Sequence, residues 1–192
     1  MDSTKNILLV GVGGQGIILA SKILSAGLID AGYDVKMSEV HGMAQRGGSV
    51  TTQIRYGEKV YSPIIGKGQS DIIVAFEQME AERWIDYLKM NGKLVISDYK
   101  IPSAPILTGD LEYPENILED LEKRTKPIII KAAKLAKELG NIRTQNIIML
   151  GALVKAIGLE GIDWDKIIRD MIKEKYLDIN IKAFTMGKEL VD

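Results

Sequence analysis

The stretch of sequence that decides the fold is "NILLVGVGGQG", from Asn6 to Gly16. A short apolar run that ends in glycines predicts a buried strand followed at once by a tight loop. Residues 16–32 then place apolar side chains at helical spacing and end at Gly32, which predicts a helix. The first N–H groups of such a helix point into the loop, where the helix dipole favours negative charge. The loop is therefore a candidate anion-binding site.

The glycines of this loop fit two interpretations. Gly11, Gly13 and Gly16 have the G-x-G-x-x-G spacing of a dinucleotide-binding loop. Glu39, at the end of the next expected strand, stands where an acid that binds a ribose would be sought. Glycines also allow a helix to pack tightly against a strand without any ligand. An NAD(P)- or FAD-binding oxidoreductase and a loop built only for packing both stay open on spacing alone.

The rest of the chain alternates between strand and helix patterns. We expect strands at 34–40, 70–76 and 93–99, a hairpin with arms at 49–57 and 58–65, and a helix at 77–92. Residues 101–114 predict an irregular connection with a short strand at 104–109, and helices are expected at 116–124, 126–140, 145–159 and 163–176. This order predicts an α/β protein: a three-layer, Rossmann-like α/β/α fold with a mixed, mostly parallel sheet and an extra helical C-terminal part.

Composition excludes several classes of function. The 192 residues carry a formal net charge of −1, with 46% hydrophobic and 27% charged residues, so nothing favours nucleic acid or an anionic membrane as a partner. No apolar run approaches the roughly 20 residues that span a bilayer, and "MDSTKN" is unlike a signal peptide, so we expect a cytoplasmic protein. The absence of cysteine excludes disulfides, a cysteine nucleophile and an ordinary iron–sulfur cluster on this chain. A single histidine argues against a catalytic zinc site, and we expect no metal site.

A second motif, "SEVHGMAQRGGSV", follows the next expected strand. A planar guanidinium beside two adjacent glycines suits a carboxylate or a phosphate. Arg46 could instead form a salt bridge that shapes the loop, and His41 could be an ordinary hydrogen-bonded loop residue. The candidate site residues of this motif are Glu39, His41, Gln45, Arg46, Gly47 and Gly48.

The two motifs in this order, "GVGGQG" and then "EVHGMAQRGG", resemble the gamma-type domain of 2-oxoacid:ferredoxin oxidoreductases. The resemblance covers most of the chain, including "YSPII" and the late helix "RTQNIIMLGAL". The form "GMAQRGG" is most similar to the small (beta) subunits of indolepyruvate:ferredoxin oxidoreductases, although a sibling acting on another aryl or branched 2-oxoacid also fits. Residues 1–192 would then form one such domain, with a sheet-forming part at 1–113 and a mainly helical part at 114–192.

The resemblance implies a division of labour between subunits. In that family a 2-oxoacid and coenzyme A become acyl-CoA and carbon dioxide, and two electrons pass to ferredoxin. Thiamine diphosphate forms the carbanion and iron–sulfur clusters carry the electrons. This chain has no cysteine and no G-D-G…N-N thiamine pattern, because Gly109-Asp110 is followed by Leu111 and no Asn-Asn pair occurs. We therefore expect no cofactor on this chain, a larger (alpha) partner subunit that holds both, a hetero-oligomer, and an isolated chain without activity.

The resemblance also locates the site. The loop residues Gly13, Gly14, Gln15 and Gly16 and the loop at 46–48 would converge at the C-terminal edge of the sheet. There they would line the active-site cleft against the larger subunit and steer coenzyme A or the substrate carboxylate. Glu39, His41 and Gln45 would orient these groups or pair across the interface, and no residue is assigned as general acid or base. A purely structural subunit, whose loops only contact the partner, is a third hypothesis.

One further site near the late helix has two interpretations. Thr144, Gln145 and Asn146 precede an apolar helix and would by default cap it. Their match to the family's late helix makes packing behind the glycine loop the alternative.

Overall fold

In the computed structural model, which describes residues 4–42 and 47–192, the chain forms a six-stranded sheet in the order β2-β3-β1-β4-β5-β6. β1, β4, β5 and β6 are parallel, whereas β3 runs antiparallel to both β1 and β2. The expected mixed, mostly parallel sheet is confirmed. The strands are β1 (Lys5–Val12), β2 (Asp34–His41), β3 (Ser49–Gly57), β4 (Ser70–Ala75), β5 (Leu88–Ser97) and β6 (Ile128–Ile130).

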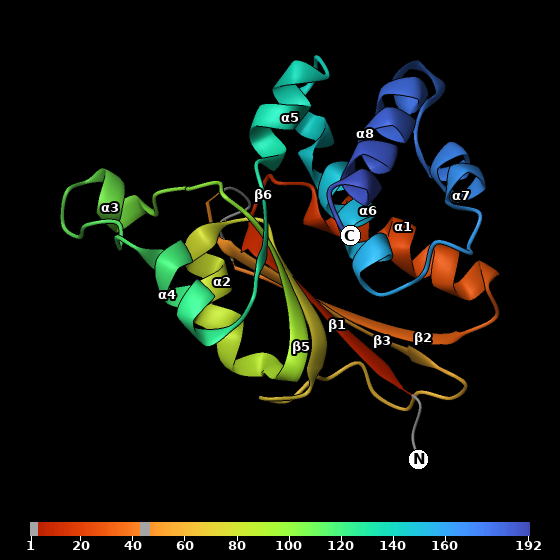
Figure 1. Cartoon of the computed structure of the whole chain (residues 1–192), viewed down its shortest axis with the longest axis horizontal. Coiled ribbons are helices and arrows are strands. Elements are labelled where there is room, and N and C mark those ends of the chain that lie inside the picture. The colour runs from red at the N-terminus through yellow and green to blue at the C-terminus, as the bar shows by residue number, and fades with distance from the viewer. Residues whose placement is uncertain (1–3, 43–46) are drawn as a thin grey trace.

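Helices cover both faces of the sheet and give the expected three layers (Figure 1). The side chains of β1 alternate between two separate cores, which is why every one of its apolar residues is buried. One core lies under α2 (Gln78–Trp84) and α4 (Ile117–Arg124). The other lies under α1 (Ile17–Asp30), α5 (Ala132–Glu138), α6 (Gln145–Ala156), α7 (Trp164–Met171) and α8 (Leu177–Glu189).

The α6–α8 crossing is unusually close, because each helix has a glycine at the contact. A Cβ atom on Gly151 of α6 would lie 2.2 Å from the carbonyl oxygen of Phe184. A Cβ atom on Gly187 of α8 would lie 2.0 Å from the carbonyl oxygen of Ile148. The two backbones therefore touch directly, and α6 is buried between α8 and the sheet.

The expected helix at 77–92 is too long. α2 ends at Trp84, one 3₁₀ turn follows at Ile85–Tyr87, and β5 begins at Leu88. Asn91 has a left-handed backbone, with φ at 64°, inside an irregular stretch of the pairing between β4 and β5. Asn91 lies after the helix has ended, and the Asn-Gly pair at 91–92 is the sequence signal that this stretch is not helical.

The prediction of a second hairpin arm at residues 58–65 is also wrong. Residues 58–65 form no strand, and β3 pairs instead with β2 and β1. The segment is tied down by side chains: the N–H of Val60 donates to Asp34 Oδ2 (2.9 Å) and that of Ile65 donates to Gln53 Oε1 (2.6 Å). Backbone groups that bond to side chains are not available for a strand ladder.

The remaining corrections concern the second half of the chain. The expected strand at 104–109 is a short helix, α3 (Ala104–Leu107), with proline in its first turn. The expected helix at 126–140 begins with strand β6, because three consecutive isoleucines pair with β5, and only then continues as α5. The expected helix at 163–176 ends at Met171, after which the chain is extended at Ile172. None of the helices in the described ranges has the length and apolar character needed to cross a membrane.

Candidate functional site

The two sequence motifs meet at one edge of the sheet. β1 and β2 run in the same direction, and β3 returns between them, so the loops that follow β1 and β2 lie side by side. The N–H of Gly13 donates to the carbonyl oxygen of Gly48 at 2.8 Å. The structure thus brings the glycine loop at 13–16 and the second motif together at the C-terminal edge.

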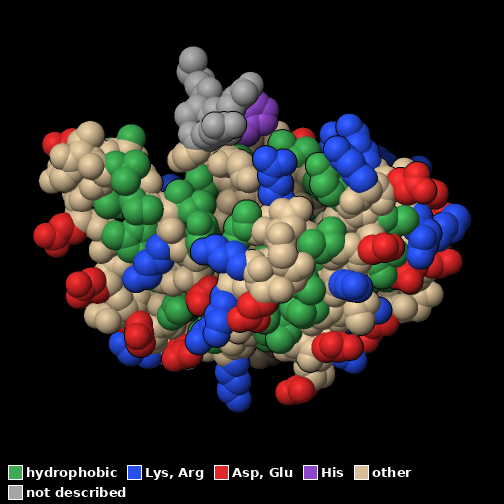
Figure 2. All heavy atoms as spheres, turned by 90° about the horizontal axis from the view of Figure 1, so that it is seen from above, with side chains coloured by type: hydrophobic (Ala, Val, Ile, Leu, Met, Phe, Trp, Pro, Cys, Tyr) green, Lys and Arg blue, Asp and Glu red, His purple; other side chains and the backbone are tan. Residues whose placement is uncertain are grey.

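A pocket of about 450 Å³, here called the glycine pocket, opens between these loops. A Cβ atom on Gly14, whose φ is +100°, would meet no described heavy atom within 4 Å, so the backbone there faces open space. His41 is exposed at the rim (purple in Figure 2), with Nδ1 3.4 Å from the carbonyl oxygen of Gly42. The lining residues are Val12, Gly13, Gly14, Gly16, Ile17, Ile18, His41 and Val50.

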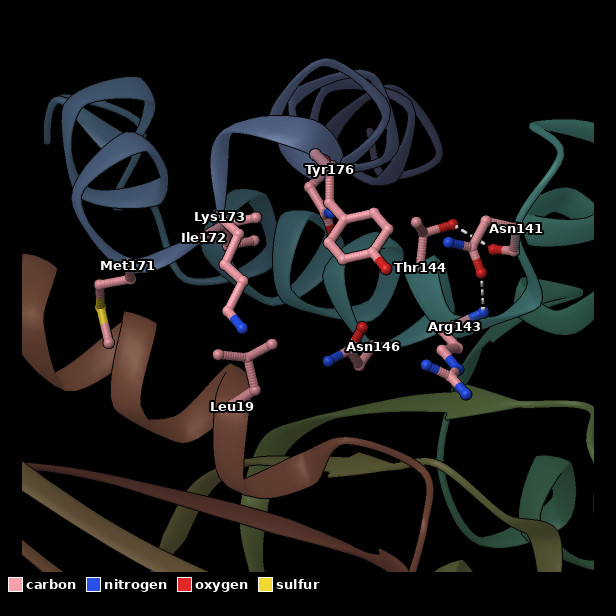
Figure 3. A pocket seen from close by; sticks show the side chains of 10 residues that line it. Leu19, Asn141, Arg143, Thr144, Asn146, Met171, Ile172, Lys173 and Tyr176 are labelled. Carbon is pink, nitrogen blue, oxygen red and sulfur yellow. Dashed lines mark hydrogen bonds between the residues drawn. The ribbon is translucent and has the colours of Figure 1, made fainter.

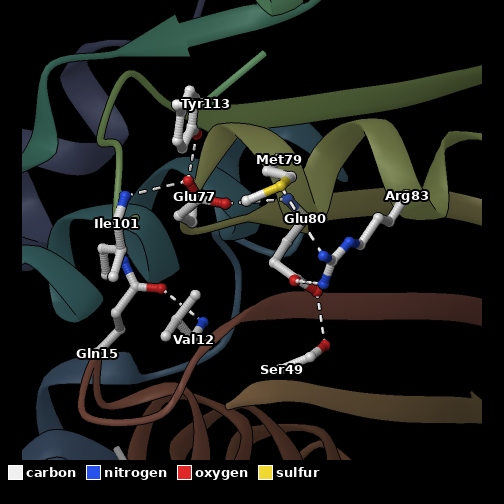
Figure 4. Close-up of polar contacts among 9 residues, drawn as sticks. All are labelled: Val12, Gln15, Ser49, Glu77, Met79, Glu80, Arg83, Ile101 and Tyr113. Carbon is white, nitrogen blue, oxygen red and sulfur yellow. Dashed lines mark hydrogen bonds and ion pairs between the residues drawn. The ribbon is translucent and has the colours of Figure 1, made fainter. Parts of the chain in front are cut away.

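Gln15 holds the loop from within rather than facing the pocket. Its side chain is buried, and Oε1 accepts from the N–H of Val12 at 2.8 Å (Figure 4). Nε2 donates to the carbonyl oxygen of Phe76 at 2.6 Å. A Cβ atom on Gly11 would lie 2.7 Å from Gln15 Oε1, so glycine is required for this bracing. Gln15 therefore positions the loop against the end of β4.

Asn146 supports the loop from behind. Its Nδ2 donates to the carbonyl oxygen of Gly16 at 3.0 Å, and the residue is only 3% exposed. Gly16 has φ +78°, and a Cβ atom on it would lie 2.5 Å from that same Nδ2. Of the two interpretations of Asn146, the structure supports packing behind the glycine loop. The prediction that these residues cap α6 is wrong, because its N-cap residue, Thr144, makes no side-chain hydrogen bond to the first turn.

Glu39 does not have the position of a ribose-binding acid, which lies at the end of the strand next to β1. In dinucleotide-binding folds the second strand adjoins the first, whereas here β3 separates β2 from β1. The half-buried carboxylate faces α1, with Oε1 3.3 Å from the hydroxyl of Ser21. This topology gives the dinucleotide interpretation no support.

The other predicted residues of the second motif divide into two groups. Gln45 and Arg46 lie outside the described residues. Gly47, with φ +79°, and Gly48 return the chain to β3 beside the glycine loop.

Two buried carboxylates, which the sequence patterns did not single out, follow β4 at this edge (Figure 4). Glu77 is fully buried; Oε2 accepts from the N–H of Glu80 (3.0 Å), and Oε1 accepts from the N–H of Ile101 (3.1 Å) and from the hydroxyl of Tyr113. Burial and this bond to Glu77 raise the pKa of Tyr113 above its ordinary range. Glu77 thereby fixes the start and the end of the connection between β5 and α4.

Glu80 fixes the end of the second motif in a similar way. Its carboxylate accepts from the hydroxyl of Ser49 (2.6 Å), at the start of β3, and from Arg83 (2.8 Å). The signal in the sequence is a pair of acids three residues apart directly after an apolar strand, as at the start of a helix. These acids position the edge and do not face the glycine pocket.

The donor set of the chain does not fit an iron–sulfur cluster, because there is no cysteine. Within residues 4–42 and 47–192, no group of three or more His, Asp or Glu side chains could hold a metal ion.

Comparison with known proteins agrees with the two motifs. Residues 6–190 match the family described as pyruvate ferredoxin/flavodoxin oxidoreductase. The chain belongs to this family. The indolepyruvate oxidoreductase subunit IorB of Pyrococcus horikoshii is 39% identical over 189 residues, which cover 95% of this chain and 93% of the relative.

Two solved structures of ferredoxin oxidoreductases share the fold. The gamma subunit of a keto/oxoacid ferredoxin oxidoreductase from Geobacter sulfurreducens superposes with a TM-score of 0.73 at 23% identity, over 97% of this chain and 95% of that one. The 2-oxoglutarate:ferredoxin oxidoreductase of Magnetococcus marinus, solved with 2-oxoglutarate, coenzyme A and succinyl-CoA bound, also gives a TM-score of 0.73 at 23% identity. In that case 99% of this chain matches 31% of the longer one.

Proposed function

We propose that this chain is the thiamine-free, cluster-free subunit of a 2-oxoacid:ferredoxin oxidoreductase that acts on indolepyruvate or another aryl 2-oxoacid. The complex would convert the 2-oxoacid and coenzyme A to acyl-CoA and carbon dioxide and pass electrons to ferredoxin. A relative of similar length is an indolepyruvate oxidoreductase subunit, and this chain has no cysteine to hold a cluster. Thiamine diphosphate and the iron–sulfur clusters would reside on a larger alpha subunit.

The observation that carries this proposal is the glycine pocket at the C-terminal edge. The N–H groups of the first turn of α1 have no partner within the helix, and the helix dipole adds positive potential there. Because Gly14 leaves the backbone open, an anionic group can approach these N–H groups closely. We infer that the pocket holds an anionic part of coenzyme A or the carboxylate of the 2-oxoacid, with His41 at its rim. Coenzyme A and a 2-oxoacid are both present in the solved M. marinus relative.

A pair of glycine variants tests the pocket in the complex with the large subunit. Gly14→Ala adds a methyl group at the pocket, whereas Gly32→Ala adds one at the far end of α1. Both glycines have positive φ, at +100° and +89°, and both new Cβ atoms meet open space, so the backbone cost is matched. We expect Gly14→Ala to raise the KM for coenzyme A or the 2-oxoacid about tenfold, the effect of losing one hydrogen bond to a charged group, and Gly32→Ala to leave it unchanged.

The same assay separates the active-site role from a purely structural one. Unchanged KM values for both substrates in Gly14→Ala would remove the pocket from the site. If Arg46→Ala impairs assembly but not turnover per assembled complex, the second motif only contacts the partner. We expect the opposite result for Arg46→Ala: intact assembly with weaker use of coenzyme A or the 2-oxoacid.

A further inference from the structure

A second pocket, also of about 450 Å³, lies where α1, the start of α6 and the connection between α7 and α8 meet (Figure 3). Asn146 separates it from the glycine pocket, because the same amide that lines this second pocket also donates to the carbonyl oxygen of Gly16. Here it is called the α6 pocket. Its lining residues are Leu19, Asn141, Arg143, Thr144, Asn146, Met171, Ile172, Lys173, Tyr176 and Asn180.

The α6 pocket is electropositive. Arg143 and Lys173 line it from different elements, and none of its described lining residues is Asp or Glu. Within the described part of the chain, neither of these two side chains forms an ion pair or a hydrogen bond. Figure 3 shows the Lys173 amine on the side of Leu19 and the Arg143 guanidinium on the other side of Asn146. Two unpaired cations around one cavity favour an anionic ligand.

Side chains rather than the backbone would hold that anion. The N–H groups of Arg143 and Thr144 both donate to Asn141, to its Oδ1 and its carbonyl oxygen respectively, at 3.0 Å. The usual phosphate cradle of free N–H groups is therefore partly occupied. A guanidinium forms two parallel hydrogen bonds with a carboxylate or with a phosphate. Because few free backbone N–H groups remain here for a phosphate, the head group that we assign to Arg143 is a carboxylate.

Part of the remaining lining is apolar and would contact a hydrophobic body; the rest consists of amide and hydroxyl side chains. Leu19, Met171 and Ile172 form one side, and the ring of Tyr176 lies above Asn146 (Figure 3). A cavity of this size that combines apolar side chains with convergent polar groups can hold a small molecule. Tyr176 offers a ring face or edge to an aromatic ligand.

We propose that the α6 pocket binds an aromatic carboxylate, distinct from the ligand of the glycine pocket. The choice of an aromatic body rests on the proposed function, whose substrate class is an aryl 2-oxoacid. The carboxylate pairs with Arg143, Lys173 on the other side of Asn146 adds positive potential, and the ring lies between Tyr176 and the apolar side. Because Asn146 contacts both pockets, the occupant lies one side chain away from the glycine loop.

A calorimetric titration of the full chain with indole-3-acetate tests this site. We expect Arg143→Ala to weaken binding about tenfold or more, as loss of a charge-assisted hydrogen bond does. Lys173→Ala should also weaken binding, through the lost positive potential. Arg169→Ala removes an exposed cation from α7 outside the pocket and Gly14→Ala alters the glycine pocket; both should bind as the parent chain does. Indole-3-acetamide, which lacks the charge, and acetate, which lacks the ring, should bind at least tenfold more weakly.

Three results would overturn the proposal. They are no binding of indole-3-acetate, binding in the Arg143 and Lys173 variants that equals that of the parent chain, or tighter binding of inorganic phosphate than of indole-3-acetate. The titration needs no partner subunit. A negative titration would therefore disprove only the α6 pocket, and a negative turnover assay of the complex would disprove only the proposed function.

Discussion

Gly16 meets two constraints at once, from its own backbone and from Asn146. Alanine in a left-handed conformation costs about 1 kcal/mol, and displacing Asn146 would add the loss of its hydrogen bond, about 1 kcal/mol. We expect Gly16→Ala to lower the free energy of unfolding by about 2 kcal/mol or more, measured by denaturant titration. Gly14→Ala, with the same sign of φ but open space around it, should cost only the backbone part, about 1 kcal/mol.

A double-mutant cycle isolates the contact between the two residues. In an Asn146→Ala background the clash is absent, so the cost of Gly16→Ala should fall to about 1 kcal/mol. An unchanged cost in that background would show that Asn146 does not support the loop.

Tyr56 makes stability depend on alkaline pH. Burial, followed by the neighbouring Tyr33 and Asp71, raises its pKa to about 12, whereas an unfolded tyrosine titrates near pH 10. The neutral phenol is therefore favoured on folding, so its contribution is complete below about pH 10 and is lost as the pH rises towards 12, at most about 3 kcal/mol in all. Urea titrations at several pH values between 9 and 12 should show a shallower loss for Tyr56→Phe than for the parent chain. Parallel losses would contradict this assignment.

Single residues of the site were predictable where their type restricts the backbone, or, for His41, where the residue lies in the second motif. Gly13, Gly14 and Gly16 could be assigned to the pocket because a tight turn after a strand needs the backbone freedom of glycine. Gln15 could not, because whether an amide side chain turns inward depends on Phe76, far along the chain. The buried role of Glu77 likewise depends on residues 101 and 113, which reach it only through the tertiary fold.

At the scale of elements, strong local patterns predicted β1, α1, β3, β4 and α4 close to their observed bounds. The failures occur where pairing or side-chain contacts override local preference. β6 has only three residues and its pairing with β5 is not visible in the sequence. Residues 58–65 have β-forming side chains, but Asp34 and Gln53 take up two of their backbone N–H groups.

The α6–α8 crossing yields a prediction at this scale. Gly151→Ala or Gly187→Ala would place a methyl group about 2 Å from a backbone oxygen of the other helix, so the helices must separate. Even after the gain of about 1 kcal/mol in helix propensity, we expect a net loss of about 2 kcal/mol or more in the free energy of unfolding. Gly161→Ala, whose Cβ would meet no described heavy atom within 4 Å and whose φ is not positive, should change it by less than about 0.5 kcal/mol. Equal, small effects at all three positions would mean that α6 and α8 do not touch.

Across the whole molecule, the two edges of the sheet differ in chemistry. The C-terminal edge carries the glycine loops and, at the end of β2, the exposed side chain of Val40. The opposite edge carries ion pairs such as those of Asp71 with Lys5 and Lys89. The Asp71 side chain is only 15% exposed, whereas the two lysines reach solvent. If the larger subunit completes the active site, it must cover the C-terminal edge.

Two matched surface variants test that orientation. Val40, 58% exposed, lies at the C-terminal edge, and Met90, 88% exposed, lies near the start of β5 at the opposite edge. Aspartate at either position should lower the free energy of unfolding by less than about 1 kcal/mol, because neither side chain is buried. For Val40→Asp we expect the affinity for the large subunit to fall about tenfold or more, since a charge would be buried without a partner at the interface, while Met90→Asp should assemble normally. Sedimentation of the mixed subunits measures both affinities, and a defect confined to Met90→Asp would place the partner on the opposite edge.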